Sequence, residues 1–285
     1  MPDKIDAFES LFKSADKPAL EYERIVFRSV VVVTDLDESA AERFALSVRR
    51  FLSTVESDRP AWHTLAGGTY DTADALIDGV ESRRPDLIVT YRNLHDSDRR
   101  PRFSLGTYLD ELTQATPVPV LVMPTGADGR PLESKDGAQS VMVLTDHLTG
   151  DKLLVDYGAR MTAAGRRLIL VHVEDERTFR RYLDAIEKIP DIETDVVRDR
   201  LRGQLLKEPE DYIESCARVL DEVGLDIAIE RVVRFGHRIA DCRRLIADRA
   251  VDLLVTHTRR GDELAMGGAA YLITAEIRDT PLLLL

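Results

Sequence analysis

The chain has 285 residues, close to twice the length of an ordinary domain, so we expect two domains of about 140 residues or one large one. Apolar residues make up 44% of the sequence, which excludes a disordered chain, and no apolar run approaches the roughly 18 residues of a membrane helix. The 51 acidic residues outnumber the 39 basic ones, and the net charge of −12 argues against nonspecific binding to nucleic acid or anionic lipid.

The start of the sequence lacks the basic and then apolar order of a secretory signal, so we expect a cytoplasmic protein. Residues 5–12 have the pattern of a short helix. A valine-rich strand follows at residues 29–34, and further strands are predicted at residues 85–91 and 117–123. Only ten positions separate Leu52 from Trp62, too few for a strand and a helix. We therefore expect this part to have lost its second strand and the following helix, or to keep a remnant of them.

Residues 124–139 are rich in Pro, Gly and Asp and are typical of a linker. Beyond the linker, strands are predicted at residues 141–146, 167–173, 226–236, 252–257 and 281–285. Amphipathic helices are predicted between them at residues 153–161, 179–189, 212–223, 239–246 and 270–277. This alternation predicts a doubly wound α/β fold with a parallel sheet, right-handed crossovers and helices on both faces.

The chain repeats itself. The segment SVVVVTDLDES at residues 29–39 recurs as SVMVLTDHLTG at residues 140–150, which matches Asp35 to Asp146 with an offset of 111. PDLIVTY at residues 85–91 recurs as VDLLVTH at residues 251–257 with an offset of 166, and PVPVLVM near residue 120 has an echo in the final TPLLLL. Three matches in the same order indicate two copies of one unit, the second about 55 residues longer in its middle.

The repeat predicts a domain organisation. We expect a first domain at residues 1–125, a linker at 126–139, and a second domain at 140–285 that carries a helical insertion at about 176–209. The first copy is then truncated, and each copy has a doubly wound, mostly parallel sheet of its own.

Ligands of open α/β sheets bind beyond the carboxyl ends of the strands, where neighbouring connections leave in opposite directions. If the first and fourth strands of a complete copy are neighbours, this rule selects the loops after Asp35 and Thr90 in the first copy and the loops after Asp146 and Thr256 in the second. The candidate binding residues there are Thr34, Asp35, Tyr91, Gly106 and Thr107 in the first copy, and Asp146, His257, Gly267 and Gly268 in the second.

The motifs resemble the universal stress protein family, twice over. They are TD at the end of the first strand, LVHV at residues 170–173, DLIV or DLLV before a polar loop, a Gly-rich helix start, and PVLV at the end. The resemblance covers nearly the whole chain. It implies an adenine-nucleotide-α-hydrolase-like fold that often binds ATP without being a dedicated enzyme and often dimerises through its fifth strand. The two copies would then pack as a pseudo-dimer, and a homodimer is a further option.

The resemblance also implies roles for the site. In nucleotide-binding members the Asp of the first strand, here Asp35, approaches the adenosine part, and a glycine-rich loop wraps the phosphates. This loop departs from the pattern in both copies. Residues 91–105 contain no glycine before Gly106 and Thr107, and they include the phosphate-repelling Asp96 and Asp98 beside Arg99, Arg100 and Arg102. Residues 257–266 contain only Gly261 and lead to Gly267-Gly268-Ala269 without a hydroxyl.

Structural roles compete with these functional ones. Asp35 and Asp146 are also in position to cap the helices that follow them. Thr107 and Asp110 match a capping box, and Gly267 with Gly268 suits close packing of a helix on a strand. His172, inside an apolar strand, is typical of a hydrogen-bonded core histidine.

We find no catalytic or metal constellation. His237, Cys242 and His257 lack the paired short spacings of a zinc site, and no G-x-S-x-G, Walker or G-x-G-x-x-G motif follows a strand. The expected function is a non-enzymatic stress-response or regulatory module with a degenerate ATP-binding crevice and a protein partner of unknown identity. One alternative is a pure interaction module without ligand. A less favoured one is an adenylating enzyme, whose SGG-type loop or histidine pair TDLDES and TDHLTG lack.

Overall fold

The computed structural model describes residues 20–96, 104–126, 128–132, 136–145, 152–189, 194–258 and 266–285. Three groups of predictions lie outside these residues. They are the short helix at residues 5–12, the candidate Asp146, and the loop residues Asp98, Arg99, Arg100, Arg102 and Gly261.

Strands and helices alternate along the described chain. The strands are β1 (Ser29–Val33), β2 (Ala61–Leu65), β3 (Leu87–Tyr91), β4 (Val120–Met123), β5 (Ser140–Thr145), β6 (Arg166–Asp175), β7 (Ile227–Gly236), β8 (Leu253–Thr256) and β9 (Leu282–Leu284). The helices are α2 (Glu38–Phe51), α3 (Ser53–Glu56), α4 (Ala73–Glu81), α5 (Thr107–Ala115), α6 (Lys152–Met161), α7 (Glu176–Ile186), α8 (Thr194–Glu222), α9 (Arg238–Asp248) and α10 (Gly268–Glu276). This order confirms the predicted α/β class.

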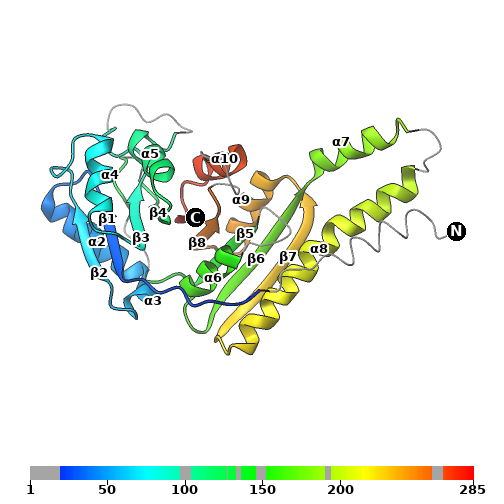
Figure 1. Ribbon diagram of the computed structural model, residues 1–285, viewed down its shortest axis with the longest axis horizontal. Helices are drawn as coiled ribbons and strands as arrows, with labels where there is room; N and C mark the ends of the chain where they lie inside the picture. The colour runs from blue at the N-terminus through cyan, green and yellow to red at the C-terminus, as the bar shows by residue number, and fades with distance from the viewer. Residues whose placement is uncertain are drawn as a thin grey trace.

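The described strands form one sheet of nine strands in the order β2-β1-β3-β4-β9-β8-β5-β6-β7 (Figure 1). Every neighbouring pair is parallel except β4 and β9, which run antiparallel with Leu121 opposite Leu283. The expected two sheets are therefore hydrogen-bonded to each other through the last strand of each half. Because β4 and β9 pair with each other, neither strand remains an exposed edge, and the apolar residues of both are buried at this joint.

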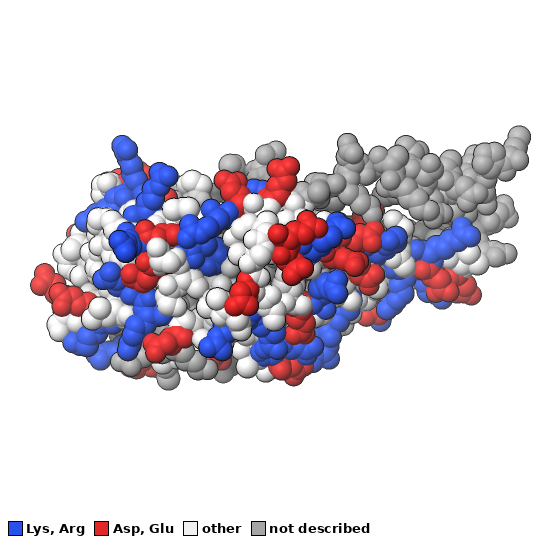
Figure 2. All heavy atoms as spheres, turned by 90° about the horizontal axis from the view of Figure 1, so that it is seen from below, with Lys and Arg blue, Asp and Glu red and all other residues white. Residues whose placement is uncertain are grey.

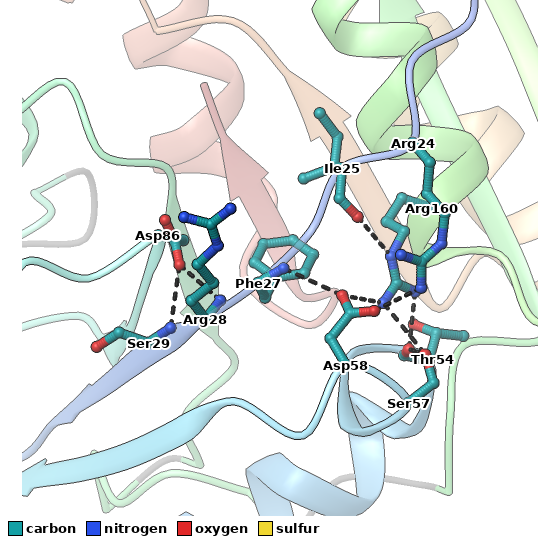
Figure 3. A network of polar contacts seen from close by, with 10 residues as sticks. All are labelled: Arg24, Ile25, Phe27, Arg28, Ser29, Thr54, Ser57, Asp58, Asp86 and Arg160. Atoms are coloured by element: carbon teal, nitrogen blue, oxygen red, sulfur yellow. Dashed lines mark hydrogen bonds and ion pairs between the residues drawn. The ribbon is translucent and has the colours of Figure 1, made fainter.

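The two halves of the sheet share a hydrogen bond at matching strand positions. In the first half, Asp86 Oδ2 accepts the N–H of Ser29 at 3.0 Å, just before β3 and at the start of β1 (Figure 3). In the second half, Asp252 Oδ2 accepts the N–H of Ser140 at 3.2 Å at the matching positions of β8 and β5. The four strands β2-β1-β3-β4 therefore correspond to β6-β5-β8-β9. The division into domains near residues 126–139 stays a prediction.

The prediction that the first half lost its second strand is wrong. The strand β2 pairs in parallel with β1 from Ser29 opposite Ala61 to Val33 opposite Leu65, and α4 follows it. The counterpart that the first half lacks is the outer strand β7, with the helices α7 and α8. β2 lies at the sheet edge and only Leu65 within it is buried, so it has no continuous apolar run to reveal it.

The extra chain of the second half lies between β6 and β8. Its long helix α8 packs on β6 and β7, and α7 and the first part of α8 extend past the ends of these strands (Figure 1). The predicted helix at residues 212–223 is the second part of α8, which starts at Thr194 and continues through Pro209. The helices of this extra chain therefore extend past residue 209, and the bounds of the insertion stay a prediction.

Charged side chains cover much of the surface. Figure 2 shows acidic and basic groups interspersed over one face of the molecule, with no large area of a single sign. Within the described residues, no helix is both long and apolar enough to cross a membrane.

A buried ion pair joins the two halves (Figure 3). Arg160 on α6 lies 2.7 Å from Asp58, which follows α3, and their side chains are 7% and 4% exposed. The guanidinium also donates to the carbonyl oxygens of Ile25 and Thr54, at 2.8 and 2.7 Å. Asp58 in turn accepts the N–H of Phe27 at 3.0 Å. Burial by itself raises the pKa of Asp58, but these donors outweigh burial and lower the pKa to about 2.

Candidate functional site

Asp35 and Tyr91 meet where the neighbouring strands β1 and β3 end. The Tyr91 hydroxyl donates to Asp35 Oδ1 and lies 2.7 Å from Thr34 Oγ1. It also accepts the backbone N–H of Asp35 at 3.2 Å. Parallel strands bring their carboxyl ends to the same edge of a sheet, and this is why residues so far apart in sequence are in contact.

The second carboxylate oxygen of Asp35 is also occupied. The backbone N–H of His95 donates to Asp35 Oδ2 at 3.0 Å, from a loop in which His95 and Asn93 both have a φ of 58°. Both oxygens of Asp35 are thus hydrogen-bonded within the chain. The alternative that Asp35 caps the next helix is wrong, because the cap of α2 is Asp37, which accepts the N–H of Ala40 at 2.9 Å.

Three side-chain rings contact one another near Asp35. The ring centroids of Tyr70 and His95 lie 5.0 Å apart, those of Tyr70 and Tyr108 5.7 Å, and those of His95 and Tyr108 5.2 Å. The hydroxyl of Tyr70 donates to the backbone oxygen of Thr34 at 3.0 Å, and that of Tyr108 donates to the backbone oxygen of Asp71 at 3.0 Å. We call Asp35, Tyr91, Tyr70, His95 and Tyr108 the tyrosine cluster.

Gly106 lies next to the loop that carries His95. It is the N-cap of α5 with a φ of 89°, and a Cβ there would lie 2.7 Å from the Cα of Asn93, so glycine suits this position. Thr107 is the first residue of α5 and is exposed. The capping box predicted for Thr107 and Asp110 is wrong, because the N-cap is the residue before Thr107 and has no side chain.

The second half shows less of its candidate site. His257 follows β8 and is half-buried. The carbonyl oxygen of Thr258, the residue after His257, accepts the N–H of Gly267 at 2.8 Å. A Cβ on Gly268 would meet nothing within 4 Å, so close helix packing does not explain this glycine. Asp146 lies outside the described residues, as do residues 259–265.

His172 lies in the core of the second half. It is 1% exposed, with Nδ1 3.3 Å from Thr145 Oγ1 and Nε2 3.2 Å from Glu174 Oε2. These contacts agree with a hydrogen-bonded core histidine.

The described residues contain no cluster of three or more His, Cys, Asp and Glu side chains that could hold a metal ion. Cys216 and Cys242 are buried, and burial raises the pKa of Cys242 to about 12, which keeps it a neutral thiol near pH 7. Neither cysteine is placed to act as an exposed nucleophile.

The structure thus brings Thr34, Asp35 and Tyr91 together and places Gly106 at the adjacent helix start. Sequence reasoning missed Tyr70, His95 and Tyr108. Their common signal is that each aromatic or imidazole ring follows a strand or begins a helix on the carboxyl side of the sheet. The nucleotide-binding role of these positions stays a prediction.

No family model matches the chain, and no curated protein matches it in sequence. Solved structures do. A functionally unknown protein from Pseudomonas aeruginosa PAO1 and a candidate universal stress protein from Pseudomonas aeruginosa UCBPP-PA14 are each 15% identical to the chain, with a TM-score of 0.51. Both alignments cover 91% of this chain, and they cover 92% and 93% of the other two. The chain has the universal stress protein fold. A universal stress protein from Archaeoglobus fulgidus DSM 4304 also matches, at 12% identity over 90% of this chain and 85% of its own, with a TM-score of 0.44.

Within this universal stress protein fold, Tyr91→Phe tests whether the hydrogen bond from Tyr91 to Asp35 stabilises the first half. Removing the hydroxyl takes a donor from a carboxylate in a part-buried place, so we expect the free energy of unfolding to fall by about 1.5–3 kcal/mol. Urea denaturation measures the change. The matched control is Tyr108→Phe, which loses one bond to an exposed backbone oxygen and should cost less than about 1 kcal/mol. Equal losses in the two variants would contradict the assignment.

Proposed function

We propose that the chain is a non-enzymatic regulatory module of the universal-stress type that acts through a protein partner, with its first crevice filled by its own side chains. The observation that supports this proposal is the double engagement of Asp35 by Tyr91 and His95. A nucleotide that used Asp35 would have to displace at least one of these donors, and hydrogen bonds to a charged group are about twice as strong as neutral ones.

Two hydroxyls of the cluster are held in their neutral, proton-donating form. Burial and the hydrogen bond with Asp35 raise the pKa of Tyr91, and burial and the charge of Asp35 raise that of Tyr70. Both hydroxyls therefore stay protonated near neutral pH. They serve as hydrogen-bond donors within the cluster, whereas a general base needs a pKa close to the working pH.

A second candidate is a weak adenine-nucleotide site in the same crevice. The observation that favours it is the start of α5, where Gly106 supplies no side-chain cap and Thr107 is exposed. Helix N-termini bind phosphate through their backbone N–H groups. In this candidate Asp35 faces the adenosine part and Thr107 the phosphates.

Isothermal titration separates the two candidates. We expect ATP with Mg²⁺ to give the same heat on the wild type and on Asp35→Ala, because the first crevice contributes no binding in either. Any heat from the second half is common to both proteins, so the difference isolates the first crevice. A binding heat that Asp35→Ala removes would overturn the proposal and favour the nucleotide site, as would an adenine nucleotide that co-purifies with the wild type only.

A further inference from the structure

The sheet ends in two edge strands, β2 and β7 (Figure 1). The last strands of the two halves, β4 and β9, already pair with each other. β2 runs over five residues, whereas β7 runs over ten. Within the described residues, β7 has a strand neighbour only on the side of β6. An edge strand presents a row of N–H and C=O groups with which another strand can pair, and β7 offers the longer row.

β7 lacks most of the features that protect a sheet edge. Its register with β6 continues without a bulge from Arg166 opposite Ile227 to Asp175 opposite Gly236. The strand contains no proline and no lysine, and none of its ten residues is buried. Its other charged residues are the exception, and their order decides which strand fits beside it.

The two faces of β7 carry different side chains. Arg249 at the end of α9 donates to Glu230 Oε1 at 2.9 Å, and Arg234 donates to Asp241 of α9 at 2.5 Å. Glu230, Val232 and Arg234 thus share the face toward α9, because alternate residues of a strand point to the same side. The other face, toward α8, carries Ile229, Arg231, Val233 and Phe235.

A cavity of about 470 Å³ lies between α8 and the first part of β7. Its lining consists of Glu214, Ala217, Arg218, Asp221, Leu225, Ile227, Ile229 and Arg231. The two isoleucines give the cavity apolar surface beside the sheet edge. A neighbouring strand that brings an apolar side chain to this place would cover that surface and gain stability from it.

We propose that β7 pairs antiparallel with β7 of a second copy of this chain, about a two-fold axis at Val232. Such a contact is isologous, so the same residues meet twice. Glu230 lies opposite Arg234 of the second copy, and Arg234 lies opposite its Glu230. Opposite charges on facing residues of an antiparallel pair stabilise the pairing, whereas like charges destabilise it. The strand is therefore complementary to itself.

The same register suits the face toward α8. Ile229 lies opposite Phe235 of the second copy, which brings an aromatic ring beside the cavity that Ile229 lines. Arg231 lies opposite Val233. Near the axis, Glu214 lies 3.8 Å from Arg231 of its own chain and offsets the positive charge.

Neighbouring registers fit less well. Facing residues must lie on the same side of the sheet, so the axis passes through a residue of β7. An axis at Arg231 sets two guanidinium groups opposite each other, and an axis at Glu230 or Arg234 also sets like charges opposite each other. An axis at Val233 pairs only residues 230–236, against 228–236 for the axis at Val232.

The ion pairs within the chain are compatible with this contact. The side chains of Glu230 and Arg234 are 29% and 32% exposed. A carboxylate accepts several hydrogen bonds, and a guanidinium has several donors. A bond across the axis therefore adds to the bonds with Arg249 and Asp241 and does not replace them.

Sedimentation velocity of the full chain tests the dimer. We expect a species with twice the mass of one chain, whose share rises with protein concentration. A wild type that stays monomeric up to high micromolar concentration would overturn the proposal and leave the edge to a strand of a different protein. The dimer does not depend on the proposed function, whose crevice lies in the first half, so the two can fail separately.

Val232→Cys tests the position of the axis. Residues directly opposite in an antiparallel pair have Cα atoms about 4.5–5.5 Å apart, within the range of a disulfide. We expect mild oxidation to link two Val232→Cys chains. The control is Ala228→Cys, because the two copies of this exposed residue would lie roughly 27 Å apart along the strands and should not be linked. The native Cys216 and Cys242 are buried. A wild-type dimer in which Val232→Cys is linked no better than Ala228→Cys uses another surface, and this would overturn the proposal.

Two charge variants test the complementarity. Glu230→Arg places arginine opposite Arg234 on both sides of the axis, and Arg234→Glu places glutamate opposite Glu230. We expect each variant alone to be monomeric and an equal mixture of the two to dimerise, since every facing pair of the mixed dimer has opposite charges. Each variant also loses an ion pair within its own chain, but mixing does not restore that pair, so recovery reports on the contact between chains. Homodimers of both variants as stable as the wild type, or a mixture that stays monomeric, would overturn the proposal.

Discussion

Arg160→Met should lower the free energy of unfolding by about 3–5 kcal/mol, since it leaves the buried carboxylate of Asp58 without its main partner. The change also removes donors from the carbonyl oxygens of Ile25 and Thr54. Methionine keeps most of the side-chain volume, so the loss reports on charge and hydrogen bonds more than on packing. Chemical denaturation in urea at pH 7 measures it.

Arg24→Met is the control for this ion pair. Arg24 also contacts Asp58, at 2.5 Å, but its side chain is 52% exposed, so solvent screens the interaction. We expect a loss of no more than about 1 kcal/mol. If Arg24→Met were as costly as Arg160→Met, burial would not be the source of the effect.

The same ion pair makes the free energy of unfolding depend on pH in the acidic range. The folded pKa of Asp58 is about 2, below its ordinary value of 3.8, so the contribution is fully present above pH 4 to 5 and is lost as pH falls toward 2. The shift corresponds to about 2 kcal/mol. Urea midpoints measured between pH 5 and pH 2 should fall more steeply for the wild type than for Asp58→Asn. Parallel curves for the two proteins would show that other carboxylates govern the acid response.

Gly67→Ala should destabilise the first half by about 1–3 kcal/mol or more, because a Cβ there would lie 2.3 Å from the backbone oxygen of Asp35. Backbone must move to relieve this clash, and Asp35 is the centre of the tyrosine cluster. We therefore expect both a lower melting temperature and a changed near-ultraviolet circular dichroism signal from the tyrosines.

The neighbouring Gly68→Ala is the matched control. A Cβ on Gly68 meets nothing within 4 Å, so its effect should stay within about 0.5 kcal/mol. Similar losses at both glycines would mean that the contact with Asp35 does not set the cost.

The strands that sequence predicts best are the ones covered on both faces. β1, β3 and β5 are buried or nearly so along their length, and their continuous apolar runs reveal both their positions and the repeat. The same pattern does not reveal β2, because β2 lies at the sheet edge, where most of its residues are not buried and no continuous apolar run is needed. Pairing, and not composition, decides that Ala61–Leu65 is a strand.

The candidate site divides in a similar way. The meeting of Asp35 with Tyr91 follows from their positions at the ends of strands, which topology brings together. The rings of Tyr70 and His95 reach the same place from loops and that of Tyr108 from the first turn of α5, and the loop of His95 has positive φ at Asn93 and His95. Periodicity carries no information on such backbone angles, so the positions of these rings could not be predicted.

The joint between β4 and β9 has a kinetic consequence. Two separate chains of this fold that met through these strands would form their joint at a rate set by protein concentration. Here one polypeptide supplies both partners, so the effective concentration is fixed by the tether that connects them. Dilution therefore leaves the pairing of β4 with β9 intact. The pairing forms as the chain folds and does not require two molecules to meet.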